Sequence, residues 1–166
     1  MMGTRSGSID PGILIYLLRH RGYSADDLDR ILNRESGLLG VSGFSRDIRE
    51  VMHRASIGDE RAKLAYGVYQ HRLIREAGGM LAVLGGLDAL AFTGGVGEHS
   101  AEVRAALCEQ LGFLGLKLDG AKNASAVADV DVSANGSAIP VLVIHAQEEA
   151  EIARECYRLL VNQQPA

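Results

Sequence analysis

The stretch LDALAFTGGVGEHS, residues 87–100, decides the fold class of this chain. Its first half, Leu87–Thr93, is a short apolar run with glycines on both sides, which predicts a strand buried on both faces in a parallel sheet under helices. Its second half is a glycine-rich turn, and a helix is expected from about Ser100 to Leu111. Glycines in such a turn let backbone N–H groups approach a flat or anionic ligand at the carboxyl end of the strand. The alternative is a tight strand-to-helix turn that binds nothing.

Two widespread phosphate-binding motifs do not account for this turn. Ser100 stands where the dinucleotide-binding pattern G-x-G-x-x-G needs its third glycine. The P-loop pattern G-x-x-x-x-G-K-[ST] occurs nowhere in the 166 residues. P-loop chemistry is therefore excluded.

The rest of the chain predicts an α/β layered fold with a narrow sheet. Further strands are expected at Phe113–Leu118 and Ile139–Ile144, and residues 36–43 are expected to form a loop with glycine at every third position. Three strands are few for so many helices, which indicates that strands of the sheet are missing from this sequence. Apolar periodicity predicts the other helices at about residues 11–22, 25–34, 45–55, 59–84 and 147–161. Asp10 before Pro11, and Ser24 with Asp27, are the caps expected at the start of the first two.

The composition is that of a globular chain. Of the 166 residues, 47% are hydrophobic and 23% charged, with a formal net charge of −4, which excludes intrinsic disorder as the main state. The mildly acidic balance argues against a nucleic-acid or anionic-membrane partner, and the apolar runs are far shorter than the ~18 residues of a membrane-spanning helix. We therefore expect a cytoplasmic protein, in which Cys108 and Cys156 are small buried side chains.

Three further motifs place charged side chains where they could meet a ligand. Arg5 lies between Gly3 and Gly7 just before a helix, so its planar guanidinium could meet a carboxylate or a phosphate. Residues 45–50 carry two arginines and two acids at a helix start, and Glu148 follows the strand at Ile139–Ile144, where a carboxylate could meet Mg²⁺. Each motif has a plain alternative: a solvated surface arginine, a solvated helix face, and a glutamate that favours the first turn of a helix.

Taken in order along the chain, these motifs closely resemble those of the acetate kinase family. The resemblance rests on residues 2–11, 36–43, 45–49, 92–98 and 148–155, and it covers essentially the whole chain. It implies an α/β domain of the actin, Hsp70 and sugar-kinase type, which is ribonuclease H-like, here incomplete and with extra helices. It also implies that ATP and acetate react with Mg²⁺ to give ADP and acetyl phosphate, reversibly, in a cleft between two domains of a homodimeric enzyme.

The resemblance assigns a role to each matching position. Arg5 matches the catalytic arginine at the substrate carboxyl and the transferring phosphoryl group, and Glu148 matches the acidic residue assigned to Mg²⁺. His99 stands where the family commonly has Asn, and Ile48 stands at a position that varies among relatives. The positions implied in nucleotide binding are Asp47, Ile48, Arg49, Gly94, Gly95, Val96, Gly97 and His99.

The family chain is more than twice as long as this one. By that likeness, residues 1–166 are the C-terminal, nucleotide-binding and dimerisation domain of an acetate kinase. The first strands of that domain and the whole N-terminal domain would be absent, and the chain alone would be inactive. Two alternatives remain: a propionate kinase, and a non-catalytic fragment that binds nucleotide or dimerises.

Overall fold

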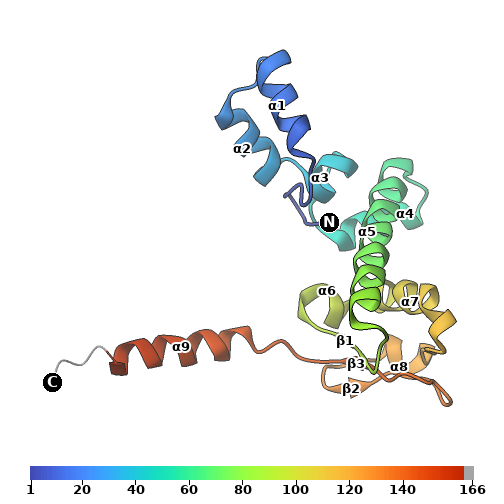
Figure 1. The fold of residues 1–166 in the computed structure, drawn as a ribbon. Helices are drawn as coiled ribbons and strands as arrows, with labels where there is room; N and C mark the ends of the chain where they lie inside the picture. The colour runs from blue at the N-terminus through green and yellow to red at the C-terminus, as the bar shows by residue number, and fades with distance from the viewer. Residues whose placement is uncertain (163–166) are drawn as a thin grey trace. The chain divides into compact units, whose positions relative to one another are not determined.

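The structure is a computed structural model that describes residues 1–162, and it divides into two compact units. The first unit runs from Met1 to Val83 and the second begins at Leu84. Figure 1 shows that the first unit is helical and that the strands belong to the second. Among the described residues, no helix is both long enough and apolar enough to cross a membrane.

The first unit contains five helices, and the predicted caps begin two of them. Asp10 accepts a hydrogen bond from the backbone N–H of Gly12, and Ser24 and Asp27 form a reciprocal capping box. Such caps satisfy N–H groups that have no partner within the helix. The helices are α1 (Pro11–His20), α2 (Ala25–Arg34), α3 (Gly37–Ser42), α4 (Ile48–Ser56) and α5 (Glu60–Leu84).

The prediction of a loop at residues 36–43 is wrong, because most of this segment is helix α3. The first N–H groups of α3 do not face water: Leu38 and Leu39 donate to the carbonyls of Met2 and Gly3, over 2.9 and 3.0 Å. Gly37 adopts φ +63°, and a Cβ on it would lie 2.2 Å from the Met2 carbonyl oxygen. The glycines there allow the N-terminal segment to lie against the helix, and they do not mark a loop.

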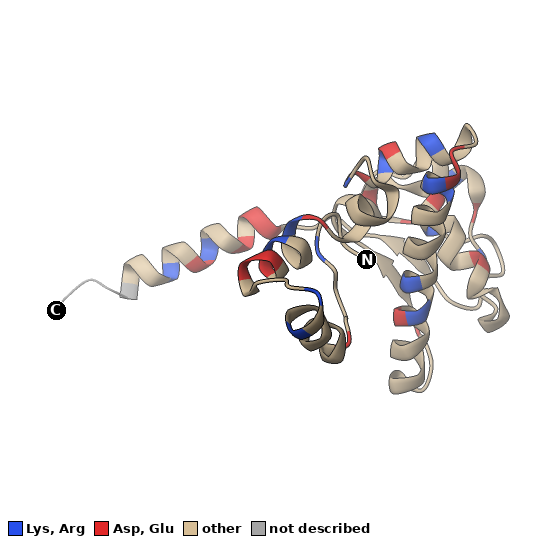
Figure 2. Ribbon diagram, turned by 90° about the horizontal axis from the view of Figure 1, so that it is seen from above, with Lys and Arg blue, Asp and Glu red and all other residues tan. Residues whose placement is uncertain are grey.

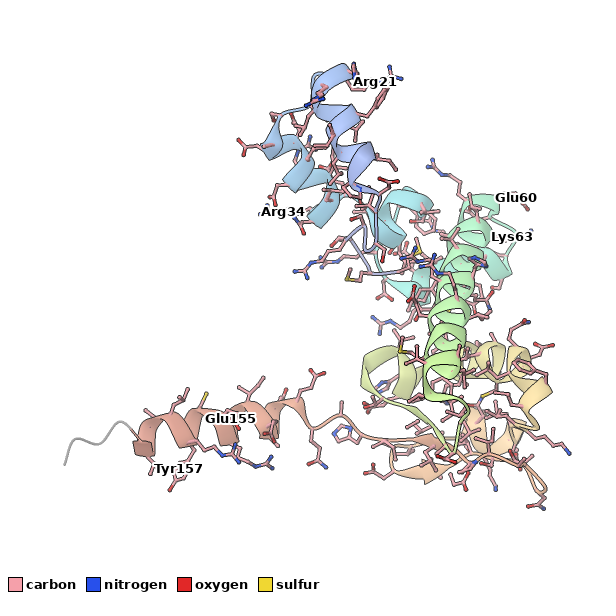
Figure 3. The ribbon with its side chains drawn as sticks, in the orientation of Figure 1. Arg21, Arg34, Glu60, Lys63, Glu155 and Tyr157 are labelled. Atoms are coloured by element: carbon pink, nitrogen blue, oxygen red, sulfur yellow. The ribbon has the colours of Figure 1, made fainter. Side chains whose placement is uncertain are left out.

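The start of α4 also differs from the prediction by three residues. Asp47 caps the helix by accepting from the Arg49 N–H over 2.9 Å, so the helix begins at Ile48 and not at Ser45. Ser45 is buried and belongs to a turn in which its N–H and carbonyl both bond to the Ser42 hydroxyl. The long helix α5 agrees with the prediction, and Glu60 and Lys63 in its first turn form an exposed ion pair of 2.7 Å (Figure 3).

The second unit is built on a three-stranded sheet in the order β1-β3-β2. Strand β1 (Leu90–Phe92) pairs in parallel with β3 (Val141–Val143), as the sequence predicts for its two apolar runs. The central strand β3 contributes Val141 and Val143 to the core, both fully buried. Ala91 is exposed, so β1 is not buried on both faces as expected. Strand β2 (Val130–Asp131) pairs antiparallel with β3 and was not predicted, because it has only two residues.

The strand predicted at Phe113–Leu118 is wrong. Residues Gly112–Leu114 form the 3₁₀ helix η1, Gly115 ends it with φ +83°, and only Leu118 makes a β-bridge, to Ser133. Phe113 is 79% exposed, so this run of apolar residues does not form a strand of the core. The remaining helices of the unit are α6 (Gly94–His99), α7 (Ala101–Gln110), α8 (Gly120–Ala124) and α9 (Glu148–Asn162).

Helix α9 is exposed along all its described side chains. Its first turns carry three glutamates and its later turns carry both signs of charge (Figure 2), and Glu155 and Tyr157 point away from the ribbon (Figure 3). Cys156 on this helix is exposed, contrary to expectation, whereas Cys108 on α7 is buried as predicted. Burial raises the pKa of the Cys108 thiol to about 11.

We predict that Gly37→Ala destabilises the first unit by more than about 2 kcal/mol, because it combines a positive φ with a Cβ against the Met2 carbonyl. The measurement is the urea midpoint followed by far-UV circular dichroism. Gly67→Ala is the matched control: Gly67 lies within α5, and a Cβ on it would meet nothing within 4 Å, so alanine there should stabilise by up to about 1 kcal/mol. Equal midpoints for the two variants would contradict the close approach.

Candidate functional site

The glycine-rich turn, residues 93–99, leaves the carboxyl end of β1 and folds at once into the short helix α6. Gly94 makes the change of direction with φ +73°. Gly95 has an unstrained backbone, and a Cβ built on it would meet nothing within 4 Å. The backbone at Gly95 therefore faces open space, which agrees with a turn that lets a ligand approach.

That space is a cavity of about 620 Å³ at the edge of the sheet. Strands β1 and β3 are parallel with Phe92 beside Val143, so the segments that follow them leave from the same edge. In open α/β sheets this is the edge at which ligands bind. The cavity is lined from the first segment by Gly94, Gly95, Glu98 and His99, and from the second by residues 145–150.

Glu98 joins these two segments through its carboxylate. One oxygen, Oε1, accepts from the backbone N–H groups of both Gly94 and Ala146, over 2.8 and 2.9 Å. The other, Oε2, lies 2.9 Å from Nδ1 of His145. Hydrogen bonds from the Ala146 amide and from His145 lower the pKa of Glu98, and the bond to Glu98 raises the pKa of His145. The carboxylate therefore favours its charged form although only 9% of the residue is exposed.

Arg104 on α7 holds the opposite end of α6. Its side chain is buried, and Nη1 donates to the carbonyls of Gly97 and Glu98, both over 2.8 Å. Its Nε and Nη2 donate to the side-chain and backbone oxygens of Asn123, each over 2.7 Å. A buried guanidinium is tolerated only when such acceptors replace water. The glycine-rich turn is thus fixed to α7 and α8.

Of the predicted site residues of the second unit, Gly94, Gly95, His99 and Glu148 line this cavity, and Val96 and Gly97 do not. His99 is exposed, and its Nδ1 lies 3.0 Å from the carbonyl of Gly95. Glu148, the first residue of α9, lines the cavity with an exposed side chain, beside Glu149. Val96 and Gly97 lie in α6, and a Cβ on Gly97 would be 3.3 Å from the backbone of Phe92, so this glycine serves packing.

Arg5 lies in the first unit, with an exposed side chain on a well-held backbone. On either side of it, the Thr4 carbonyl accepts from Ser36 N–H over 2.8 Å, and Ser6 N–H donates to the Leu32 carbonyl over 2.9 Å. In the part of the chain that the structure describes, the guanidinium makes no hydrogen bond or ion pair. Arg5 is thus anchored and available to a ligand.

The three predicted residues at the start of α4 have different environments. Asp47 caps the helix, Ile48 is buried, and Arg49 is exposed. The Arg49 guanidinium bonds to both carboxylate oxygens of Asp47 and holds the pKa of that carboxyl at about 2. The Ile48 side chain is buried, so only its backbone remains for a ligand. Arg49 is the exposed member, with 84% of its side chain in solvent.

Glu148 and Glu149 place two exposed carboxylates at the cavity. Residues 1–162 contain no cluster of three or more His, Cys, Asp or Glu side chains that could hold an ion. A hard cation such as Mg²⁺ is commonly held by one or two carboxylates, the phosphates of the substrate and water. Glu148 and Glu149 fit that pattern.

Three residues of the site were missed in the sequence: Glu98, His145 and Arg104. A signal existed for Arg104, because it shares the helix face of Val103, Leu107 and Cys108, where a charged side chain is out of place unless it is bonded. Glu98 and His145 are 47 residues apart, and only the pairing of β1 with β3 brings them together.

Solved structures define the class to which this fold belongs. The chain superposes on an acetate kinase from Porphyromonas gingivalis with a TM-score of 0.84 and 38% identity, over 96% of this chain and 40% of that one. A propionate kinase from Francisella tularensis gives 0.82 and 39%, over 93% of this chain and 39% of that one. The fold is therefore of the actin, Hsp70 and sugar-kinase class, present here as a partial α/β domain with many helices.

Sequence comparison defines the family. The sequence model of the acetokinase family matches residues 1–154. The acetate kinase of Nostoc punctiforme is 58% identical over 162 residues, which are 98% of this chain and 40% of that protein. That of Gloeobacter violaceus is 56% identical over 160 residues, 96% of this chain and 40% of that protein. The chain belongs to the acetokinase family, and it spans about 40% of the length of these relatives.

The Glu98–His145 pair makes a pH-dependent contribution to stability. The lowered pKa of Glu98 gives stability that is complete above its ordinary value of 4.5 and lost as the pH falls. The raised pKa of His145 gives stability that is complete below its ordinary value of 6.5 and lost as the pH rises through the raised one. The pair should therefore stabilise most between about pH 4.5 and 6.5.

We predict that the difference in melting temperature between the wild type and Glu98→Gln is largest near pH 5.5, roughly the middle of that window. The difference should be smaller at about pH 3.5 and about pH 8.5, which lie below and above the window. The measurement is thermal unfolding at the three pH values. Glu109→Gln, which removes an exposed carboxylate from α7, should give a small difference at each pH. A Glu98→Gln difference of the same size at pH 5.5 and 8.5 would contradict the ion pair.

Proposed function

We propose that this chain is the C-terminal portion of an acetate kinase, which transfers the γ-phosphoryl group of ATP to acetate and forms ADP and acetyl phosphate reversibly. The observation that carries the proposal is the cavity at the carboxyl ends of β1 and β3, where an open glycine-rich turn faces the carboxylate of Glu148. The identity of 53–58% with curated acetate kinases, over 94–98% of this chain, supports it.

In this proposal the glycine-rich turn binds the nucleotide. Gly94 and Gly95 would present backbone to the adenosine, and His99 lines the same cavity. Val96 and Gly97, which the resemblance also assigns to nucleotide binding, would act from the short helix α6. Glu148 would be the protein ligand of Mg²⁺, which, when bound to ATP, neutralises charge on the phosphates. An exposed carboxylate at the cavity rim fits that ion, since substrate phosphates and water supply its other ligands.

Residues of the first unit would contact acetate, the transferring phosphoryl group and part of the nucleotide. The Arg5 guanidinium, anchored by its backbone, would pair with the acetate carboxyl and with the charge that grows on the transferring phosphoryl group. Arg49 and the backbone at Ile48 would contact the nucleotide, while Asp47 keeps Arg49 oriented through two hydrogen-bonded oxygens.

The assembly and the location of the protein are part of the same proposal. Residues 1–166 would be the nucleotide-binding and dimerisation domain of a cytoplasmic homodimer. The remaining catalytic groups would lie in a domain that this chain does not contain. The span of about 40% of the relatives' length supports that division.

Propionate kinase is the second candidate. The propionate kinase of Francisella tularensis is as similar in structure and sequence as the acetate kinase of Porphyromonas gingivalis. One additional methylene in a substrate changes discrimination by only about 1–3 kcal/mol, so a few pocket residues decide the choice. A fragment that binds nucleotide or dimerises without catalysis is the third candidate, and it would bind ATP without turnover.

The test of the activity is a coupled assay of ADP formation by the complete enzyme that contains this chain, with acetate or propionate as acceptor. The proposal expects a higher kcat/KM with acetate. A higher kcat/KM with propionate selects the second candidate, and ADP formation that needs neither acid contradicts both.

We predict that Gly95→Val raises the KM for ATP, or the Kd, by about tenfold or more, while the melting temperature falls little. A Cβ on Gly95 meets no protein atom within 4 Å, so the new side chain obstructs the ligand and not the fold. Gly120→Val, which also places a side chain in open space at the start of a helix, is the matched control and should leave ATP binding unchanged. An unchanged ATP affinity in Gly95→Val would show that the turn has a structural role alone.

We predict that Arg5→Ala in the complete enzyme lowers kcat by about a thousandfold or more and changes the affinity for ATP little, because the guanidinium acts on charge that develops during transfer. Arg5→Lys should recover little, since an ammonium does not reproduce the planar fork. Arg34→Ala removes an exposed arginine of the same unit (Figure 3) and should keep full turnover. Near-normal turnover by Arg5→Ala would contradict the assignment.

A further inference from the structure

We propose that Glu98 is a positioning residue that holds the glycine-rich turn and the Glu148 segment at a fixed separation, so that nucleotide and metal bind as one unit. The proposal rests on the proposed function, because it assigns the two segments to nucleotide and Mg²⁺. Glu98 itself matches none of the catalytic, nucleotide or metal positions that the resemblance implies.

The first observation is that a single atom joins the two segments. Oε1 of Glu98 accepts from Gly94 N–H at 2.8 Å and from Ala146 N–H at 2.9 Å. Gly94 begins the turn, and Ala146 lies two residues before Glu148. Two donors that share one acceptor cannot move apart without the loss of at least one hydrogen bond, and bonds to a charged acceptor are about twice as strong as neutral ones.

The second observation is that Glu98 is fixed at its own backbone. Its carbonyl accepts from Nη1 of Arg104 over 2.8 Å, and the same nitrogen donates to the Gly97 carbonyl. The side chain of Glu98 therefore starts from an immobile point at the end of α6 and reaches back to the first residue of that helix. The Glu98 carboxylate thus links the Ala146 segment to α7, and His145 N–H in the same segment also donates to Asp129 over 3.1 Å.

The third observation separates positioning from catalysis. Glu98 is 9% exposed, and both its carboxylate oxygens already have protein partners. Glu148 is exposed at the cavity, so its place depends on the segment that carries it. Loss of a group that orients a metal ligand typically costs ~10–100-fold in metal affinity or activity.

Two variants separate the geometry from the charge. Glu98→Gln can keep its carbonyl oxygen at the position of Oε1, where it still accepts from Gly94 and Ala146. Glu98→Ala removes the shared acceptor altogether. We expect Glu98→Ala to raise the Kd of ATP in the presence of Mg²⁺ by about tenfold or more, and Glu98→Gln to stay within about threefold of the wild type at pH 8.

The binding measurement is calorimetry of ATP with Mg²⁺ and of ATP with EDTA, on the 166-residue chain. The ratio of the two Kd values should approach one in Glu98→Ala, because Glu148 no longer follows the turn. Two controls should keep the wild-type ratio: Val103→Ala, which removes buried methyl groups from α7, and Glu109→Ala, which removes an exposed carboxylate from it. A wild-type ratio in Glu98→Ala would overturn the coupling.

Amide hydrogen exchange measured by NMR tests, without any nucleotide, whether Glu98 holds the two segments together. The N–H groups of Gly94 and Ala146 should exchange faster together in Glu98→Ala, and at nearly the wild-type rate in Glu98→Gln. Unchanged protection in Glu98→Ala would overturn the proposal even if ATP binds. Loss of protection in a chain that binds no ATP would uphold the positioning role of Glu98 and contradict the assignment of nucleotide binding to the turn.

Discussion

A guanidinium that is buried away from water must find acceptors for its N–H groups within the protein, and Arg104 finds them on three residues. The carbonyls of Gly97 and Glu98 and the two oxygens of Asn123 accept from it over 2.7–2.8 Å. Asn123 in turn donates from Nδ2 to the Ala101 carbonyl over 2.8 Å. Loss of one partner would leave a charge or a carbonyl buried without compensation, so α6, α7 and α8 are held as a set.

The position of the cavity in the second unit follows from that constraint. With the end of α6 fixed, Glu98 reaches both the start of the same helix and the segment after β3, and the cavity lies where these two segments meet. The sheet contributes the parallel pairing of β1 with β3, which makes both segments leave from one edge. Glu98 itself lies in the first segment, but the residues that fix its backbone lie outside both segments: Arg104 in α7, and Asn123 in α8, which bonds to Arg104.

Much of this fold could be predicted from local pattern. The caps at Asp10 and Ser24, the long helix α5 and the parallel strands β1 and β3 follow from residue type and spacing alone. The errors arise where tertiary contact overrides local pattern. Gly37 permits a close backbone contact within a helix, and the apolar run at Phe113–Leu118 lies largely outside the core. Glycines and charges in the sequence are enough to nominate candidate site residues, and several of these line the cavity. The hydrogen bonds of Glu98 and Arg104 depend on long-range pairing that no local pattern specifies.

We propose above that nucleotide binds at the turn held by Arg104 and Glu98. The most direct test is to titrate the isotope-labelled 166-residue chain with ATP and Mg²⁺ and to follow every backbone amide by NMR. We expect the largest shifts within residues 94–99 and 145–150, the two segments that contribute the lining of the cavity. Saturable binding that leaves both of these segments unshifted would contradict it.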